Sequence, residues 1–142
     1  MNTTSAAVAG PAVFVWLGMV LAISFLEAPL KFRAPGVTIP IGLGIGRLVF
    51  QALNLAEAAL AGVVILAVVV GSAPAVVTVL TVMVAVLLVG QLAVIRPRLN
   101  RRSDRILAGE ELPRSRGHLQ YVTAEIAKVV VLIALGISVL AK

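Results

Sequence analysis

Three glutamates, Glu27, Glu57 and Glu125, lie within or at the edge of long apolar runs of this 142-residue chain. A carboxylate at the centre of a lipid bilayer costs about 2.5–3.5 kcal/mol to insert, so such a side chain faces a protein interior, a partner or water. There it can bind a proton or a small cation, or it can form an ion pair that holds helices together. The same residues therefore support a functional and a structural interpretation.

The composition indicates which elements position these side chains. Hydrophobic residues make up 61% of the chain and the mean hydropathy is +1.11, more than the core of a soluble domain requires. We predict an all-α fold: a polytopic membrane protein with four transmembrane helices in an up-down bundle, forming one domain over residues 1–142. The predicted spans are approximately residues 11–30, 48–70, 73–95 and 118–141.

Basic residues predict the orientation of these helices. Lysines and arginines gather in residues 31–47 and 96–117, whereas the segment before the first span and the turn at residues 71–72 have none. Because cytoplasmic loops carry the excess of basic residues, we expect both basic loops in the cytoplasm and both termini outside a cell membrane. The net charge of +6 is explained in this way, since the basic residues adjoin apolar runs, and no nucleic-acid partner is expected.

Polar residues of the spans fall on shared helical faces when successive residues are placed about 100° apart. The charged ones all belong to the half of the bundle next to the basic loops, which predicts a polar vestibule open to the cytoplasm and closed by valine and leucine on the other side. Its predicted members are Glu27, Arg47, Gln51, Asn54, Glu57, Gln91, His118, Tyr121, Glu125 and Lys128.

The ion pairs that the spacing allows divide these residues between the two interpretations. Glu27 and Lys31 form an i, i+4 pair, for which a structural role is the simpler explanation. Glu57 has no such neighbour, so it needs a cation from another helix, such as Lys128, or must hold a proton. Glu125 can pair with Lys128 within one helix. We therefore take Glu57 and Glu125 as the candidates for binding a proton or cation.

Other chemistries find little support in the residue inventory. There is no cysteine and only one histidine, which excludes thiolate metal sites and bis-histidine haem ligation within one chain. No helix carries the Glu-x-x-His element of di-iron bundles, and no nucleophile, histidine and acid triad has a recognisable spacing. We therefore expect no metal, no cofactor and no catalytic residues, and nothing argues positively for an enzyme.

The first basic loop is rich in turn-forming residues. Residues 31–46 contain Pro35, Gly36 and Pro40, followed by glycines at 42, 44 and 46. This composition predicts an irregular connection. The alternating glycines lack the final spacing of a dinucleotide fingerprint and follow no predicted strand, so a phosphate-binding loop is not expected.

Several short motifs in order along nearly the whole chain resemble a known family. They are Ala28-Pro29 with Phe32-Arg33, Gly46-Arg47 with Phe50, Arg96-Pro97-Arg98, and His118 at the start of the fourth span. In these the chain resembles the transmembrane protein 205-like family of small four-span proteins, a domain of unknown function. The resemblance implies a four-helix membrane bundle, with links to metal-drug resistance claimed for some eukaryotic members, and no established catalytic residues. Glu125 stands where that family often has an asparagine.

Taken together, these features lead to a hypothesis about function. We expect a small integral membrane protein that binds or conducts a small polar or cationic solute, or protons, through the cytoplasmic vestibule. An accessory or scaffold subunit of a membrane complex is the alternative, in which the same groups bind a membrane partner subunit or lock the bundle. A membrane enzyme acting on a lipid or quinone is a weaker third. The lipid bilayer is one expected partner. The sequence does not decide whether the chain also forms a homo-oligomer or binds a membrane partner subunit.

Overall fold

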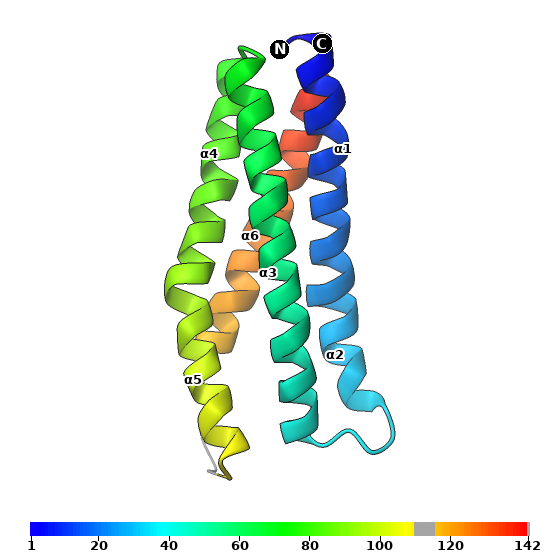
Figure 1. Ribbon diagram of the computed structural model, residues 1–142, viewed down its shortest axis with the longest axis vertical. Helices are drawn as coiled ribbons and strands as arrows, with labels where there is room; N and C mark the ends of the chain where they lie inside the picture. The colour runs from blue at the N-terminus through cyan, green and yellow to red at the C-terminus, as the bar shows by residue number, and fades with distance from the viewer. Residues whose placement is uncertain (110–115, 142) are drawn as a thin grey trace.

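The computed structural model is an up-down bundle of four helical rods, with both chain ends at the same end of the bundle (Figure 1). It describes residues 1–109 and 116–141, except for the side chains of Ser103 and residues 116–118. The elements are α1 (Thr3–Val20), a π-helical stretch (Leu21–Glu27), α2 (Ala28–Leu30), a 3₁₀ turn (Lys31–Arg33), α3 (Ile39–Val70), α4 (Ala75–Gly90), a second π-helical stretch (Gln91–Ile95), α5 (Arg96–Leu107) and α6 (Arg116–Leu140).

The predicted all-α fold is confirmed for the described residues, and four helices are long and apolar enough to cross a membrane. They run over Thr3–Arg33, Ile39–Val70, Ala75–Leu107 and Leu119–Leu140. The first three have 31, 32 and 33 residues, so each is about 46–50 Å long at the α-helical rise. These three rods therefore continue well into the segments expected to be loops. Helix α1 packs against α3 and α6, and α4 packs against the same two helices.

The predicted irregular connection over residues 31–46 is wrong for most of its length. Only residues 34–38 are non-helical, because Thr38 caps α3 by accepting a hydrogen bond from the Ile41 amide at 3.4 Å, and Pro40 lies in the first turn, where its missing N–H is not needed. Gly42 and Gly46 belong to the helix. They leave room for the Phe32 ring and the Lys31 ammonium, which lie where a β-carbon on each glycine would be. The glycines therefore serve close packing and not a turn.

Two rods change from α-helical to π-helical geometry at comparable places. Each π-helical stretch ends two residues before a proline, Pro29 in the first rod and Pro97 in the third. A proline within a helix cannot donate to the carbonyl four residues earlier and its ring clashes with that carbonyl, so a wider turn relieves both problems. Pro11 lies within α1 without such a change, so proline alone does not enforce it. The wider turns mark the boundary between two unlike halves of the bundle.

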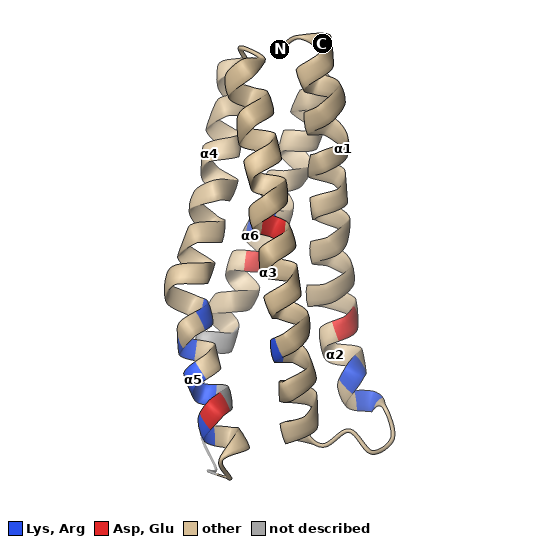
Figure 2. Ribbon diagram, in the orientation of Figure 1, with Lys and Arg blue, Asp and Glu red and all other residues tan. Residues whose placement is uncertain are grey.

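The apolar half comprises residues 1–16, 58–90 and 129–141, next to the chain termini, and it contains no charged side chain. The polar half comprises residues 17–57, 91–109 and 116–128 and contains all the described charged side chains, as Figure 2 shows. In the apolar half small and branched residues fill the interior. Its fully or almost fully buried residues include Ala9, Val13, Val64, Val77, Val84, Leu132 and Leu135.

Candidate functional site

Five polar or charged side chains, contributed by all four rods, meet in the interior where the two halves join. We call them the buried charge cluster: Trp16, Glu57, Gln91, Glu125 and Lys128. Lys128 is the centre, because its Nζ lies 2.6 Å from Glu57 Oε1, 2.7 Å from Glu125 Oε1 and 2.6 Å from Gln91 Oε1. The three charged residues are at most 1% exposed.

Two further hydrogen bonds complete the contacts of this cluster. The Trp16 indole Nε1 donates to Glu57 Oε1 at 2.8 Å, and Gln91 Nε2 donates to Glu125 Oε1 at 2.6 Å. The second oxygen, Oε2, of each glutamate is buried and has no hydrogen-bond partner among the described residues. Two carboxylates thus share one ammonium, and each retains an acceptor that no described residue uses. With both glutamates ionised the cluster would carry one negative charge.

The helical repeat explains how these residues come together. On α3 the buried face includes Gly46, Phe50, Leu53, Glu57, Ala61 and Val64, at spacings of three and four residues. On α6 a step of three residues places Glu125 and Lys128 on one face. The pairing of Glu57 with Lys128 from another helix, one of the two alternatives that the sequence offered, is confirmed.

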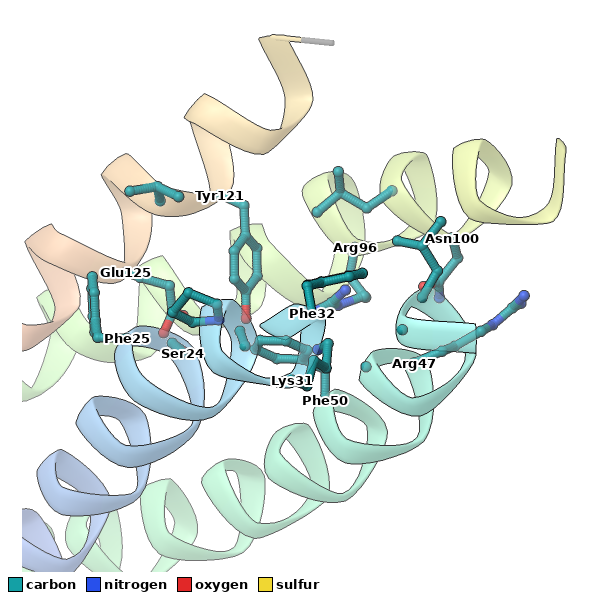
Figure 3. Close-up of a pocket in the computed structure, with 17 residues that line it drawn as sticks. Ser24, Phe25, Lys31, Phe32, Arg47, Phe50, Arg96, Asn100, Tyr121 and Glu125 are labelled. Carbon is teal, nitrogen blue, oxygen red and sulfur yellow. The ribbon is translucent and has the colours of Figure 1, made fainter. Parts of the chain in front are cut away.

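A cavity of about 470 Å³ lies beside the cluster, within the polar half. Glu125 belongs to both, so the cavity connects the cluster with the basic end of the bundle. Figure 3 shows Tyr121 and Glu125 projecting from α6 toward the other rods. The lining residues are Ser24, Phe25, Ala28, Pro29, Lys31, Phe32, Gly42, Leu43, Gly46, Arg47, Phe50, Arg96, Leu99, Asn100, Tyr121, Val122 and Glu125.

The predicted vestibule residues separate into three groups in the structure. Glu57, Gln91, Glu125 and Lys128 form the buried charge cluster together with a residue that the sequence did not suggest. The cavity is lined by Arg47, Tyr121 and Glu125 from the predicted set. Arg47 also forms an ion pair with Asp104 of α5.

Gln51, Asn54 and Glu27 belong to neither the cluster nor the cavity lining in the part of the chain described. Gln51 is exposed and Asn54 is half-buried, and neither lines the cavity or contacts the cluster in the part of the chain described. The helical repeat gives the reason, because Gln51 and Asn54 lie to one side of the buried face of α3 that carries Phe50, Leu53 and Glu57. Glu27 is half-buried beside Lys31, with 3.8 Å between Oε2 and Nζ. The His118 side chain lies outside the described residues.

Two residues important to the site were missed by the sequence analysis. Trp16 is fully buried and binds Glu57, and Arg96 lines the cavity. A signal existed for Trp16, because it is the only tryptophan and lies far from either end of its helical rod, where its N–H has to find a buried partner. Arg96 was counted only as a loop charge, since the sequence places it directly after an apolar run.

Comparison with protein-family models, with curated proteins and with solved structures finds no match for this chain. The resemblance to the transmembrane protein 205-like family therefore stays a prediction, and the function has to be argued from the side chains themselves.

Proposed function

We propose that the chain is a multi-pass membrane protein with a proton-binding site in its interior. The membrane part of this proposal is supported by the large apolar side chains that cover the outer faces of the four rods. Leu48, Leu55, Val69 and Val86, for example, are 64–75% exposed. Such faces need lipid around them, because monomeric soluble proteins rarely expose large continuous apolar surface.

The distribution of charge supports one orientation in a cell membrane. The polar half carries the arginines of α5 together with Lys31, Arg33 and Arg47, whereas the ends of the rods in the apolar half carry no basic residue among those described. Under the positive-inside tendency the polar half faces the cytoplasm, and both termini lie outside.

The observation that carries the function is the sharing of one ammonium by two buried carboxylates. Glu57 lies about 20 Å along α3 from Val70, within a hydrocarbon layer of about 30 Å. A net negative charge at that depth is costly, and one bound proton on Glu57 or Glu125 removes it. The proton needs only one of the two unused Oε2 atoms. Binding a single proton therefore neutralises the cluster without any rearrangement of its contacts.

A small monovalent cation is the competing occupant of the same site. A metal ion would gain from three or more carboxylate or imidazole ligands, and no such group exists within the described residues. Lys128 already occupies the space between the two carboxylates and repels a second cation. A proton is therefore the better fit, because it requires no coordination shell.

Access to the site is one-sided. Glu125 lines the cavity, so a proton or small polar solute reaches the cluster from the cytoplasmic end. Toward the other end the interior contains the fully buried apolar side chains of Val13, Val64 and Leu132. The arrangement thus supports binding from the cytoplasm, and conduction across the membrane would require the apolar half to open.

Infrared spectroscopy of the protein in liposomes tests the proposal, because a protonated carboxyl group absorbs apart from a carboxylate. We expect a protonated-carboxyl band that disappears in Glu57→Gln with Glu125→Gln and is retained in Glu27→Gln. Glu27 is a matched control, since it also lies in the polar half but is partly exposed beside Lys31. An unchanged band in the double variant would refute a proton at this site, and displacement of the band by sodium or potassium would identify the cation instead.

A second function, that of an accessory subunit, is favoured by one specific observation. Gln51 is exposed and Asn54 half-buried on the outward face of α3, and both lie within about 30 Å of Val70 along the helix. Amides at that depth gain from hydrogen bonds to another helix. A membrane partner subunit or a second copy of this chain would satisfy them.

Size measurement and co-purification in mild detergent test this second function. Replacing Asn54 by leucine is expected to weaken a complex that depends on this face, while leaving the monomer folded. Leu55→Ala, on a neighbouring exposed position without an amide, is the control. A complex of unchanged size and composition in Asn54→Leu would exclude this face as the interface.

A further inference from the structure

Arg96 is held between two aromatic rings in the wall of the cavity. Its guanidinium carbon lies 4.6 Å from the centroid of Phe50 and 4.7 Å from that of Tyr121. The two rings contact each other edge to face, with centroids 5.6 Å apart and an interplanar angle of 88°. Cation–π contacts on the ring faces fix the guanidinium in place while consuming none of its hydrogen-bond donors.

The donors left over form one edge of the guanidinium. Nε and Nη2 of Arg96 are buried and have no hydrogen-bond partner among the described residues. These two nitrogens point in the same direction and make the fork that binds both oxygens of a carboxylate or phosphate. No carboxylate of the described chain pairs with Arg96. A buried donor without a partner is unfavourable, and an anionic ligand at this edge would supply the missing acceptor.

Other charges around the cavity favour an anion at its mouth. Lys31 also lines it, and its Nζ lies 3.8 Å from a Glu27 oxygen, too far for a hydrogen bond. Arg47 lines it as well but is paired with Asp104. Glu125 is the one acidic residue among the described lining residues, and its Oε1 is held by Lys128. Positive charge therefore exceeds negative charge on the lining.

The rest of the cavity wall is apolar and reaches the outer surface of the bundle. Phe25 and Phe32 line the cavity and are 39% and 41% exposed, so an apolar chain could lie against them from outside. Arg96 lies about 31 Å along its rod from Ala75, which corresponds to the thickness of the hydrocarbon layer. The guanidinium edge is thus at the depth of lipid headgroups in the orientation proposed above.

We infer that this cavity binds the phosphate or carboxylate of an anionic amphiphile, with the anionic group on the Arg96 fork near Lys31 and the apolar chain against Phe25 and Phe32. This site goes beyond the proton site, because it uses different side chains. A bound anion and a proton on Glu125 would support each other, since protonation removes the one negative charge on the lining.

Titration calorimetry of the purified protein in a neutral detergent tests the inference with three probes. Dodecyl phosphate carries both the anionic group and the chain, inorganic phosphate carries the anion alone, and dodecanol carries the chain alone. We expect saturable binding of dodecyl phosphate and none of dodecanol. Tighter binding of dodecyl phosphate than of inorganic phosphate would identify a lipid-like source, and equal binding of the two would identify a soluble anion. Binding of neither would overturn the inference.

Variants separate the fork from general positive charge. Arg96→Gln is expected to weaken dodecyl phosphate binding at least about tenfold, and Arg96→Lys is expected to weaken it too, because a lysine offers no fork. Arg98→Gln is the matched control, since Arg98 lies two residues away, is exposed and does not line the cavity. Equal losses in Arg96→Gln and Arg98→Gln would show that binding follows overall charge and would contradict the assignment.

Two further variants protect the test from a folding defect and from the proton proposal. Leu43→Trp fills the cavity from α3 while leaving every charge in place, and it should abolish binding of dodecyl phosphate. Leu55→Ala changes an exposed residue that belongs neither to the cavity lining nor to the buried charge cluster, and it should leave binding within about twofold of the original. Full binding in folded Leu43→Trp would refute the cavity as the site, whatever the result for the proton.

Discussion

The apolar half and the polar half of this bundle are built from the same four rods but differ in how the interior is filled. In the apolar half, residues such as Val64, Leu132 and Leu135 are fully buried against one another. In the polar half the rods include two π-helical stretches and enclose a cavity of about 470 Å³. The apolar half also has a pocket, of about 370 Å³, but no charged residue lines it among those described. The difference indicates that one half holds the bundle together, while the other has the charges for binding.

The buried charge cluster lies where these halves meet, which explains why it is closed on one side and approachable on the other. Lys128 and Glu57 are fully buried, yet Glu125 beside them lines the cavity. A site deeper in the apolar half would have no access, and one farther into the polar half would be solvated and would bind a proton only weakly. The following predictions test this contrast, beginning with the largest effect.

Removing the shared ammonium should have the largest effect on stability. In Lys128→Met two buried carboxylates lose the one cationic partner that the described residues give them, and we expect the free energy of unfolding to fall by about 3–5 kcal/mol. Unfolding in a denaturing detergent measures it. The triple variant that adds Glu57→Gln and Glu125→Gln should recover most of the loss. If the triple variant is no more stable than Lys128→Met, the cost arises from packing and not from charge.

Equal truncations in the two halves should have unequal effects. Leu135→Ala removes a fully buried side chain of the apolar half and should cost about 2–5 kcal/mol of unfolding free energy. Leu43→Ala trims a half-buried side chain that already borders the cavity, so it should cost less than about 1 kcal/mol. The same detergent unfolding measurement compares them. Similar losses for both would contradict the distinction between the halves.

The contact that links α1 to the cluster should have an intermediate effect. Trp16→Phe removes the donor to Glu57 Oε1 but keeps an aromatic ring, and should cost about 1.5–3 kcal/mol. In Trp16→Phe with Glu57→Leu the donor and acceptor are both gone, so the two costs should not add. Additive losses in the unfolding measurement would show that the two side chains are energetically independent.

Two glycines of α3 should respond in opposite directions. Gly42→Ala forces the Phe32 ring to move and should cost about 1–3 kcal/mol. Gly62→Ala meets no atom within 4 Å and should stabilise the helix by about 0.5–1 kcal/mol. Thermal unfolding of the two variants checks the signs. Stabilisation by Gly42→Ala would mean that Phe32 does not pack against α3.

The fold and part of the site follow from the sequence for identifiable reasons. Uninterrupted apolar runs predict four long helices, and the isolation of Glu57 on its own helix pointed to Lys128 as a partner. Gln51 and Asn54 were misplaced because a stripe of polar residues was taken for the buried face of α3, whereas the apolar spacing of Phe50, Leu53 and Val64 marks that face.

The rest of the site depends on contacts between rods, which the sequence does not encode locally. From the sequence, Gly42 and Gly46 were interpreted as turn residues. In the structure they allow the Phe32 ring and the Lys31 side chain to pack against α3. In the sequence, Arg96 indicates only the orientation of the helices in the membrane. Its place in the cavity wall depends on contacts with Phe50 of α3 and Tyr121 of α6. Each of these roles arises from side chains that are distant along the chain.

The fluorescence of Trp16 offers the most direct test of a proton on the buried charge cluster. It is the only tryptophan, and its indole N–H donates to Glu57, so a change in the charge of that carboxyl should change its emission. In liposomes we predict a reversible pH-dependent emission change in the original protein that is absent in Glu57→Gln and preserved in Glu27→Gln. The same pH-dependent change persisting in folded Glu57→Gln would contradict the account.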